Sequence, residues 1–137
     1  MVDTDSLARL ALFADLTAPQ LEALAHAFAE ERHSRNDRVL RQGLSGNGFY
    51  VILAGEAAVR IEGQERARLG AGEFFGEISI FTDEAVGADV VVTSEDLRCA
   101  VLPGLELKQL LIRYPHIAVR MLEAGARRLR NANRWSA

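Results

Sequence analysis

Residues 69–81 read Leu69-Gly70-Ala71-Gly72-Glu73-Phe74-Phe75-Gly76-Glu77-Ile78-Ser79-Ile80-Phe81. The first two glycines mark a turn, and Gly76 precedes a segment that can form one turn of helix. A glycine at this point lets backbone N–H groups approach an anion closely, and the N–H groups that begin a helical turn have no partner within it. The stretch therefore predicts a cradle for an anion, with donors at Gly76, Ile78 and Ser79.

A second glycine motif lies upstream, at residues 43–55, where a polar turn leads into the apolar run Phe49-Tyr50-Val51-Ile52-Leu53. Further short strands are expected at residues 57–61, 64–69, 90–92 and 98–102, separated by polar or glycine-containing turns. Short strands at this spacing are typical of an antiparallel roll or barrel. In the hairpin at residues 57–69, alternation predicts that Val59, Ile61 and Ala67 face the core, and that Arg60 and Arg68 face solvent.

Helical patterns flank the roll. Thr17, Pro19 and Gln20 form an N-terminal capping signal for a helix at about 18–29. Two more helices are expected at about 104–113 and 116–132, separated by Pro115. We therefore expect one domain over residues 1–137, mainly β with flanking helices. The architecture would be an antiparallel, jelly-roll-like β-roll at about 30–102 with an N-terminal helix, a short cassette helix and two C-terminal helices at about 104–132.

The last predicted helix carries an apolar stripe, made by Ile117, Ala118, Met121, Leu122, Ala124, Gly125 and Leu129. The stripe would pack on the roll or against the same helix of a second chain. Charge is uneven: residues 1–97 carry 8 Lys and Arg against 17 Asp and Glu, whereas residues 98–137 carry 8 against 2. A basic helix can meet an acidic partner, nucleic acid or the acidic body of its own domain.

Together the two glycine motifs resemble the cyclic-nucleotide-binding domain family, found in catabolite-activator-type regulators, kinase regulatory subunits and cyclic-nucleotide-gated channels. The resemblance spans about residues 12–130. It implies a phosphate-binding cassette that starts at Phe75-Gly76-Glu77, a Glu77 carboxylate that accepts a hydrogen bond from the ribose 2′-hydroxyl, and cAMP or cGMP as ligand. The ligand-binding set would be Val59, Ala67, Leu69, Phe75, Gly76, Glu77, Ile78, Ser79, Val86, Gly87 and Ala88, with Arg128, Asn131 and Trp135 as candidate lid residues over the base.

The sequence departs from the family at the cation of the cassette. The family has an arginine nine or ten residues beyond the glutamate, and nine residues beyond Glu77 stands Val86, followed by the acidic Asp89. No Lys or Arg occurs between Arg68 and Arg98. A charge-assisted hydrogen bond contributes roughly 1.5–3 kcal/mol, so its loss predicts a site at least about tenfold weaker. Arg60 and Arg68 are expected at the surface and not as substitutes.

These features predict a non-catalytic sensor or regulatory domain in the cytoplasm that binds cAMP or cGMP weakly if at all. The alternative is a degenerate member of the family that serves as a protein-interaction or oligomerisation module, or that binds another small ligand. Partners would be a cyclic nucleotide and a protein, or a second copy through the C-terminal helix. No cofactor, metal-ligand spacing, catalytic constellation, membrane segment or DNA-binding element is expected, and Cys99 reads as a packed thiol.

Overall fold

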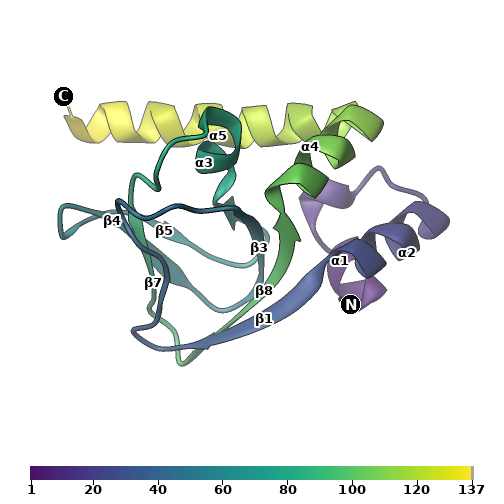
Figure 1. Ribbon diagram of the computed structural model, residues 1–137, viewed down its shortest axis with the longest axis horizontal. Coiled ribbons are helices and arrows are strands. Elements are labelled where there is room, and N and C mark those ends of the chain that lie inside the picture. The colour runs from purple at the N-terminus through teal and green to yellow at the C-terminus, as the bar shows by residue number, and fades with distance from the viewer. Residues whose placement is uncertain (137) are drawn as a thin grey trace.

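The computed structural model describes the backbone of residues 1–136 and the side chains of residues 1–132. Helices lie at both ends of the chain and at the cassette (Figure 1). Thr17 caps α2 with both hydrogen bonds of a capping box, since Gln20 N–H donates to its hydroxyl and the Gln20 side chain accepts from its N–H. The helical elements are α1 (Thr4–Ala8), η1 (Ala11–Phe13), α2 (Ala18–Ala27), α3 (Glu77–Thr82), α4 (Gly104–Arg113) and α5 (Pro115–Ser136).

Two four-stranded sheets form the roll, and all strand pairs are antiparallel. The first sheet has the order β1 (Ala29–Ser34), β8 (Asp96–Pro103), β3 (Gly48–Ala54) and β6 (Phe74–Phe75). The second has the order β2 (Arg38–Leu40), β7 (Asp89–Val92), β4 (Ala57–Ile61) and β5 (Gln64–Leu69). The predicted β-roll with flanking helices is confirmed.

The core has two parts. One part lies between the first sheet and the helices, where Phe13 packs edge-on against Phe28 and Phe49 packs against Phe74. The other part lies inside the roll and contains Ile52, Leu69, Phe75, Val92 and Cys99 among others. Cys99 is fully buried, and burial raises its pKa to about 12, so it is a packed thiol at neutral pH.

Several local predictions were wrong. The first predicted helix ends at Ala27, because Phe28 has extended backbone angles and β1 begins at Ala29. Strands β1, β2 and β6 had not been identified individually, because they are short or mostly polar. Ile61 and Ala67 are exposed, since the end of β4 and most of β5 lie outside the core.

The predicted apolar stripe on α5 packs only in part. Ile117 and Met121 are buried against the core, and Ala124 is packed against it. Leu122 and Leu129 are 72% and 65% exposed, so they do not join that contact. Figure 1 shows α5 running along one side of the molecule, with α3 beside it and α4 at its beginning. No helix within residues 1–136 combines the length and apolar character that crossing a membrane requires.

Candidate functional site

The cassette is built where the two glycine motifs meet. β6 leads into Gly76, which has φ +94° and stands immediately before α3. A Cβ at this position would clash with the carbonyl oxygen of Gly48, the first residue of β3. Only glycine combines this left-handed angle with so close an approach of two backbones. The close packing holds the start of α3, and with it Glu77, against the first sheet.

Glu77 is the main ionisable group of the cassette. Its side chain is 13% exposed, and burial raises the pKa of its carboxyl, while the nearby Arg128 guanidinium acts in the opposite direction. An ionised carboxylate only accepts hydrogen bonds, so a hydroxyl group is a suitable partner for it. The predicted contact of Glu77 with a ribose hydroxyl stays a prediction.

Arg128 of α5 holds the cassette from the other side. Its guanidinium donates a hydrogen bond of 2.6 Å to the carbonyl oxygen of Phe74 and lies 4.5 Å from the centre of the Phe74 ring. The same group lies 3.9 Å from a carboxylate oxygen of Glu77. The sequence placed Arg128 as a lid over a base, whereas the structure places it on the cassette itself.

Val86 fills the position of the expected arginine. It is 6% exposed, its N–H donates to the carbonyl oxygen of Leu44 at 2.9 Å, and its own carbonyl accepts from the N–H of Gly43 at 2.8 Å. A Cβ on Gly46 would lie only 2.6 Å from Val86 Cγ2. Both the backbone and the side chain of Val86 therefore contact the loop at residues 43–46.

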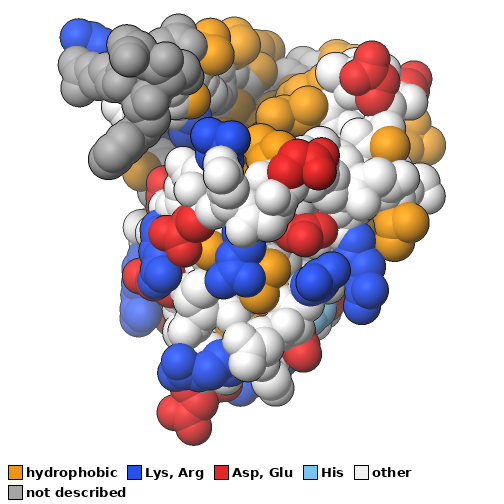
Figure 2. Space-filling view, turned by 90° about the vertical axis from the view of Figure 1, so that its left-hand side faces the viewer, with side chains coloured by type: hydrophobic (Ala, Val, Ile, Leu, Met, Phe, Trp, Pro, Cys, Tyr) orange, Lys and Arg blue, Asp and Glu red, His pale blue; other side chains and the backbone are white. Residues whose placement is uncertain are grey.

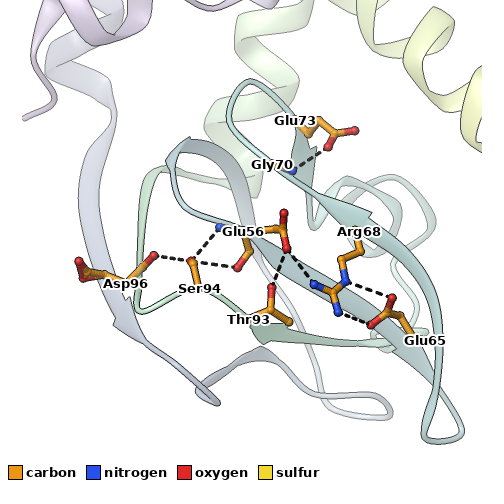
Figure 3. A network of polar contacts seen from close by, with 8 residues as sticks. All are labelled: Glu56, Glu65, Arg68, Gly70, Glu73, Thr93, Ser94 and Asp96. Carbon is orange, nitrogen blue, oxygen red and sulfur yellow. Dashed lines mark hydrogen bonds and ion pairs between the residues drawn. The ribbon is translucent and has the colours of Figure 1, made fainter.

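Charged groups around the cassette are engaged elsewhere. The Asp89 carboxylate accepts a hydrogen bond of 2.7 Å from the Gln42 N–H and lies 3.9 Å from Arg38. Arg68 lies between Glu56 and Glu65, at 2.9 Å and 3.1 Å, on the outer face of the hairpin (Figure 3). These contacts agree with the prediction that Arg68 is a surface residue.

The other predicted site residues are distributed between core and surface. Phe75 is buried and stacks on Tyr50 with ring centres 4.8 Å apart, and Leu69 belongs to the same core. Val59 is half-buried and pairs with Ala67 and Val90, but Ala67 itself is exposed. In α3, Ile78 is 70% exposed and Ser79 is buried. Gly87 is exposed, and Ala88 is half-buried.

Two cavities flank the cassette, and neither is lined by Glu77 or Val86. One, of about 540 Å³, lies between the loop at residues 43–47, α3 and the beginning of α4. The other, of about 480 Å³, lies between η1, the turn before β6 and α5, and its lining includes Phe74, Arg128 and Asn131. Two of the three predicted lid residues thus lie together. The side chain of Trp135, the third, lies outside the described residues.

Sequence reasoning missed the partners of Val86 and Glu77. Gly46 looked like an ordinary turn residue, and Arg128, which was named as a candidate lid residue, was not predicted to contact Phe74 and Glu77. A local signal existed only for the glycine, whose small size within a polar turn can indicate a close contact.

The order of the elements and the cassette geometry agree with a match of residues 30–114 to the model of the cyclic nucleotide-binding domain. The chain belongs to the cyclic nucleotide-binding domain family. This domain is 29% identical to a cGMP-dependent protein kinase of Drosophila melanogaster, isozyme 2 forms cD5/T2, over 95% of the chain. It spans only about 15% of the length of that kinase.

Solved structures give the same assignment. The domain is similar to the catabolite activator protein of Thermus thermophilus, with 30% identity, a TM-score of 0.75, and coverage of 89% of this chain and 59% of that one. It shares its fold with cAMP-bound PfPKA-R (141-441), at 16% identity and a TM-score of 0.85 over 97% of this chain and 46% of that one. It also shares its fold with the guanosine-bound regulatory subunit of a cAMP-independent protein kinase A from Trypanosoma cruzi. The identity is 23% and the TM-score is 0.73, and the match covers 85% of this chain and 42% of that one. The domain thus resembles regulatory domains, not catalytic ones.

Proposed function

We propose that this domain is a non-catalytic sensor in which occupancy of the cassette controls the position of α5. The observation that carries the proposal is the double attachment of Arg128, to Phe74 before the cassette helix and to Glu77 at its start. A ligand that bonds to Glu77 changes the partner available to Arg128. Ligand binding and helix docking are then coupled, because a ligand with different affinities for two conformations shifts the equilibrium between them.

We further propose that cAMP and cGMP bind weakly if at all. Val86 supports this, because it is buried and apolar where the family has an arginine, and because the neighbouring Asp89 adds negative charge. The proposed ligand contacts are Glu77 for the sugar and the backbone at Gly76, Ile78 and Ser79 for the remainder. Relatives that are named for cGMP or cAMP, or that are bound to guanosine, support a nucleoside-containing ligand.

The experiment is a calorimetric titration with cAMP and cGMP, combined with hydrogen exchange of α5. We expect cyclic nucleotide binding at least about tenfold weaker than in Val86→Arg or Gly87→Arg, loss of that binding in Glu77→Ala, and altered exchange around Arg128 on binding. Equal cyclic nucleotide affinity of the unmodified chain and an arginine variant would overturn the proposed weakening. Binding that leaves the exchange of α5 unchanged would overturn the sensor.

A second candidate function is an interaction or oligomerisation module. It is favoured by the apolar side chains that α5 exposes, since Val119, Leu122 and Leu129 are 55%, 72% and 65% exposed. Figure 2 shows hydrophobic side chains gathered at the helical end of the molecule. Such a surface on one helix suits self-association with a second copy. Sedimentation of Leu122→Glu beside the unmodified chain tests this function, because the substitution should shift a dimer to monomer.

A further inference from the structure

We propose that the cassette selects an uncharged ribonucleoside over the corresponding cyclic nucleotide. The inference rests on the proposed function, since it names the ligand class of the same site. It follows from three features: an apolar residue at the cation position, the lack of Lys and Arg at residues 69–97, and the presence of Glu77 as a partner for a sugar hydroxyl.

The position at which the family has its arginine is buried and apolar in this chain. Val86 is 6% exposed, and both its backbone N–H and its carbonyl are paired with the loop at residues 43–44. Its side chain lies against Gly46, where even a Cβ would come within 2.6 Å. A phosphate placed beside this valine would lose water without gaining a counter-ion, which is unfavourable for an anion.

The segment that forms the cassette supplies no other cation in place of the arginine. The sequence from Arg68 to Arg98 contains no Lys or Arg, and Arg68 is held on the outer face by Glu56 and Glu65. The Arg128 guanidinium is already bonded to the Phe74 carbonyl and paired with Glu77. Acidic side chains at Asp83, Glu84 and Asp89 follow the cassette helix, so the local potential disfavours a phosphate.

The residue proposed for the sugar contact, Glu77, is present. Glu77 is 13% exposed and stands at the start of α3, where Gly76 holds it in place against Gly48. A carboxylate in this position accepts hydrogen bonds from the ribose hydroxyls, and a nucleoside offers those donors without a phosphate charge. The arrangement therefore keeps the part of the site that a nucleoside uses and lacks the part that only a cyclic phosphate needs.

Calorimetric titrations with four probes test the proposal: guanosine, adenosine, cGMP and cAMP. We expect at least one nucleoside to bind at least about tenfold more tightly than its own cyclic nucleotide, the factor expected for a missing charge-assisted contact. The matched 2′-deoxynucleoside should bind about tenfold more weakly than the ribonucleoside, because it lacks the hydroxyl that faces Glu77. Equal affinity of a nucleoside and its cyclic nucleotide would overturn the proposal.

Two variants restore a cation and act as controls. Val86→Arg places it nine residues after Glu77, and Gly87→Arg places it ten residues after, at an exposed position where a Cβ meets nothing within 4 Å. Gly87→Arg does not disturb the buried valine, so it keeps the test valid if Val86→Arg fails to fold. We expect either variant to raise cyclic nucleotide affinity about tenfold.

The outcomes separate the two proposals. If the unmodified chain binds no nucleoside, while an arginine variant binds cGMP or cAMP, the nucleoside inference is overturned and the weakened cyclic nucleotide site stands. If no variant binds any of the four probes, both the inference and the ligand-sensing function are overturned. Nucleoside binding that persists unchanged in the 2′-deoxy form would also overturn the inference, because Glu77 would then have no part in it.

Discussion

Arg128 on α5 lies 3.9 Å from the carboxylate of Glu77 at the start of the cassette helix, and its guanidinium is bonded to the carbonyl of the preceding strand residue Phe74. Both side chains are mostly buried, with 33% and 13% exposed. One side chain thus joins the last helix to the cassette. In the proposed sensor, this contact is the one that couples the cassette to α5.

Removing this side chain should loosen the C-terminal half of α5. For Arg128→Ala we expect a loss of about 1–2 kcal/mol in the free energy of unfolding, because a charge-assisted hydrogen bond and a cation–π contact are lost at a partly exposed position. Amide exchange of α5 beyond Ala124 should become faster. Urea unfolding and hydrogen exchange measure the two effects. The control is Arg127→Ala, on the exposed neighbouring side chain, which should change stability by less than about 0.5 kcal/mol.

The buried Glu77 carboxyl should make stability depend on pH. Its pKa is raised in the folded protein, first by burial, so the folded state holds the proton more tightly than the unfolded state. The stabilisation is fully present below the ordinary glutamate pKa of about 4.3 and is lost as the pH rises through the higher folded value. Glu77→Gln lacks this titration, so its stability relative to the unmodified chain should rise with pH across that window.

Urea unfolding at several pH values measures this difference. Paired carboxyls elsewhere, such as Asp15 and Glu30, have lowered pKa values and the opposite slope, but they are common to both proteins and cancel in the comparison. A constant difference across the window would contradict the raised pKa of Glu77.

The close packing of the two glycine motifs predicts unequal effects of the same substitution at two glycines. Gly76 and Gly72 have similar angles, φ +94° and φ +90°, but only a Cβ on Gly76 would meet the Gly48 carbonyl, while one on Gly72 meets nothing within 4 Å. Gly72→Ala should cost about 1–2 kcal/mol from the left-handed angle alone. Gly76→Ala should cost about 1–3 kcal/mol more, from the clash. Equal costs in urea unfolding would show that the two motifs are not in close contact.

The fit of Val86 against Gly46 can be measured by a double-mutant cycle. Gly46→Ala should destabilise the domain by about 1–3 kcal/mol, because its Cβ would lie 2.6 Å from Val86 Cγ2. In a Val86→Ala background the same change should cost less than about 0.5 kcal/mol, giving a coupling of at least about 0.5 kcal/mol. Gly87→Ala, with open space around it, is the control and should be nearly neutral. Additive effects would argue against the contact.

Much of the fold could be predicted because its signals are local. The capping box at Thr17, the break at Pro115 and the apolar run of β3 each determine an element through neighbours in the chain, and each prediction agreed with the structure to within a few residues. The predictions failed where burial depends on partners elsewhere. Ile61 alternates correctly with its neighbours, but it lies at the end of β4, where the strand leaves the core, and it is 36% exposed.

The sequence by itself determined the β-roll, the place of the cassette and the substitution of Val86 for an arginine, because glycine spacing and residue identity are properties of one segment. The tertiary structure alone decided what surrounds that substitution. It brought Gly46 against Val86 and selected Arg128, among several arginines of α5, as the partner of Glu77 and Phe74. These contacts depend on how segments distant in the chain pack together. A van der Waals contact or an ion pair between such segments leaves no periodic pattern in the sequence.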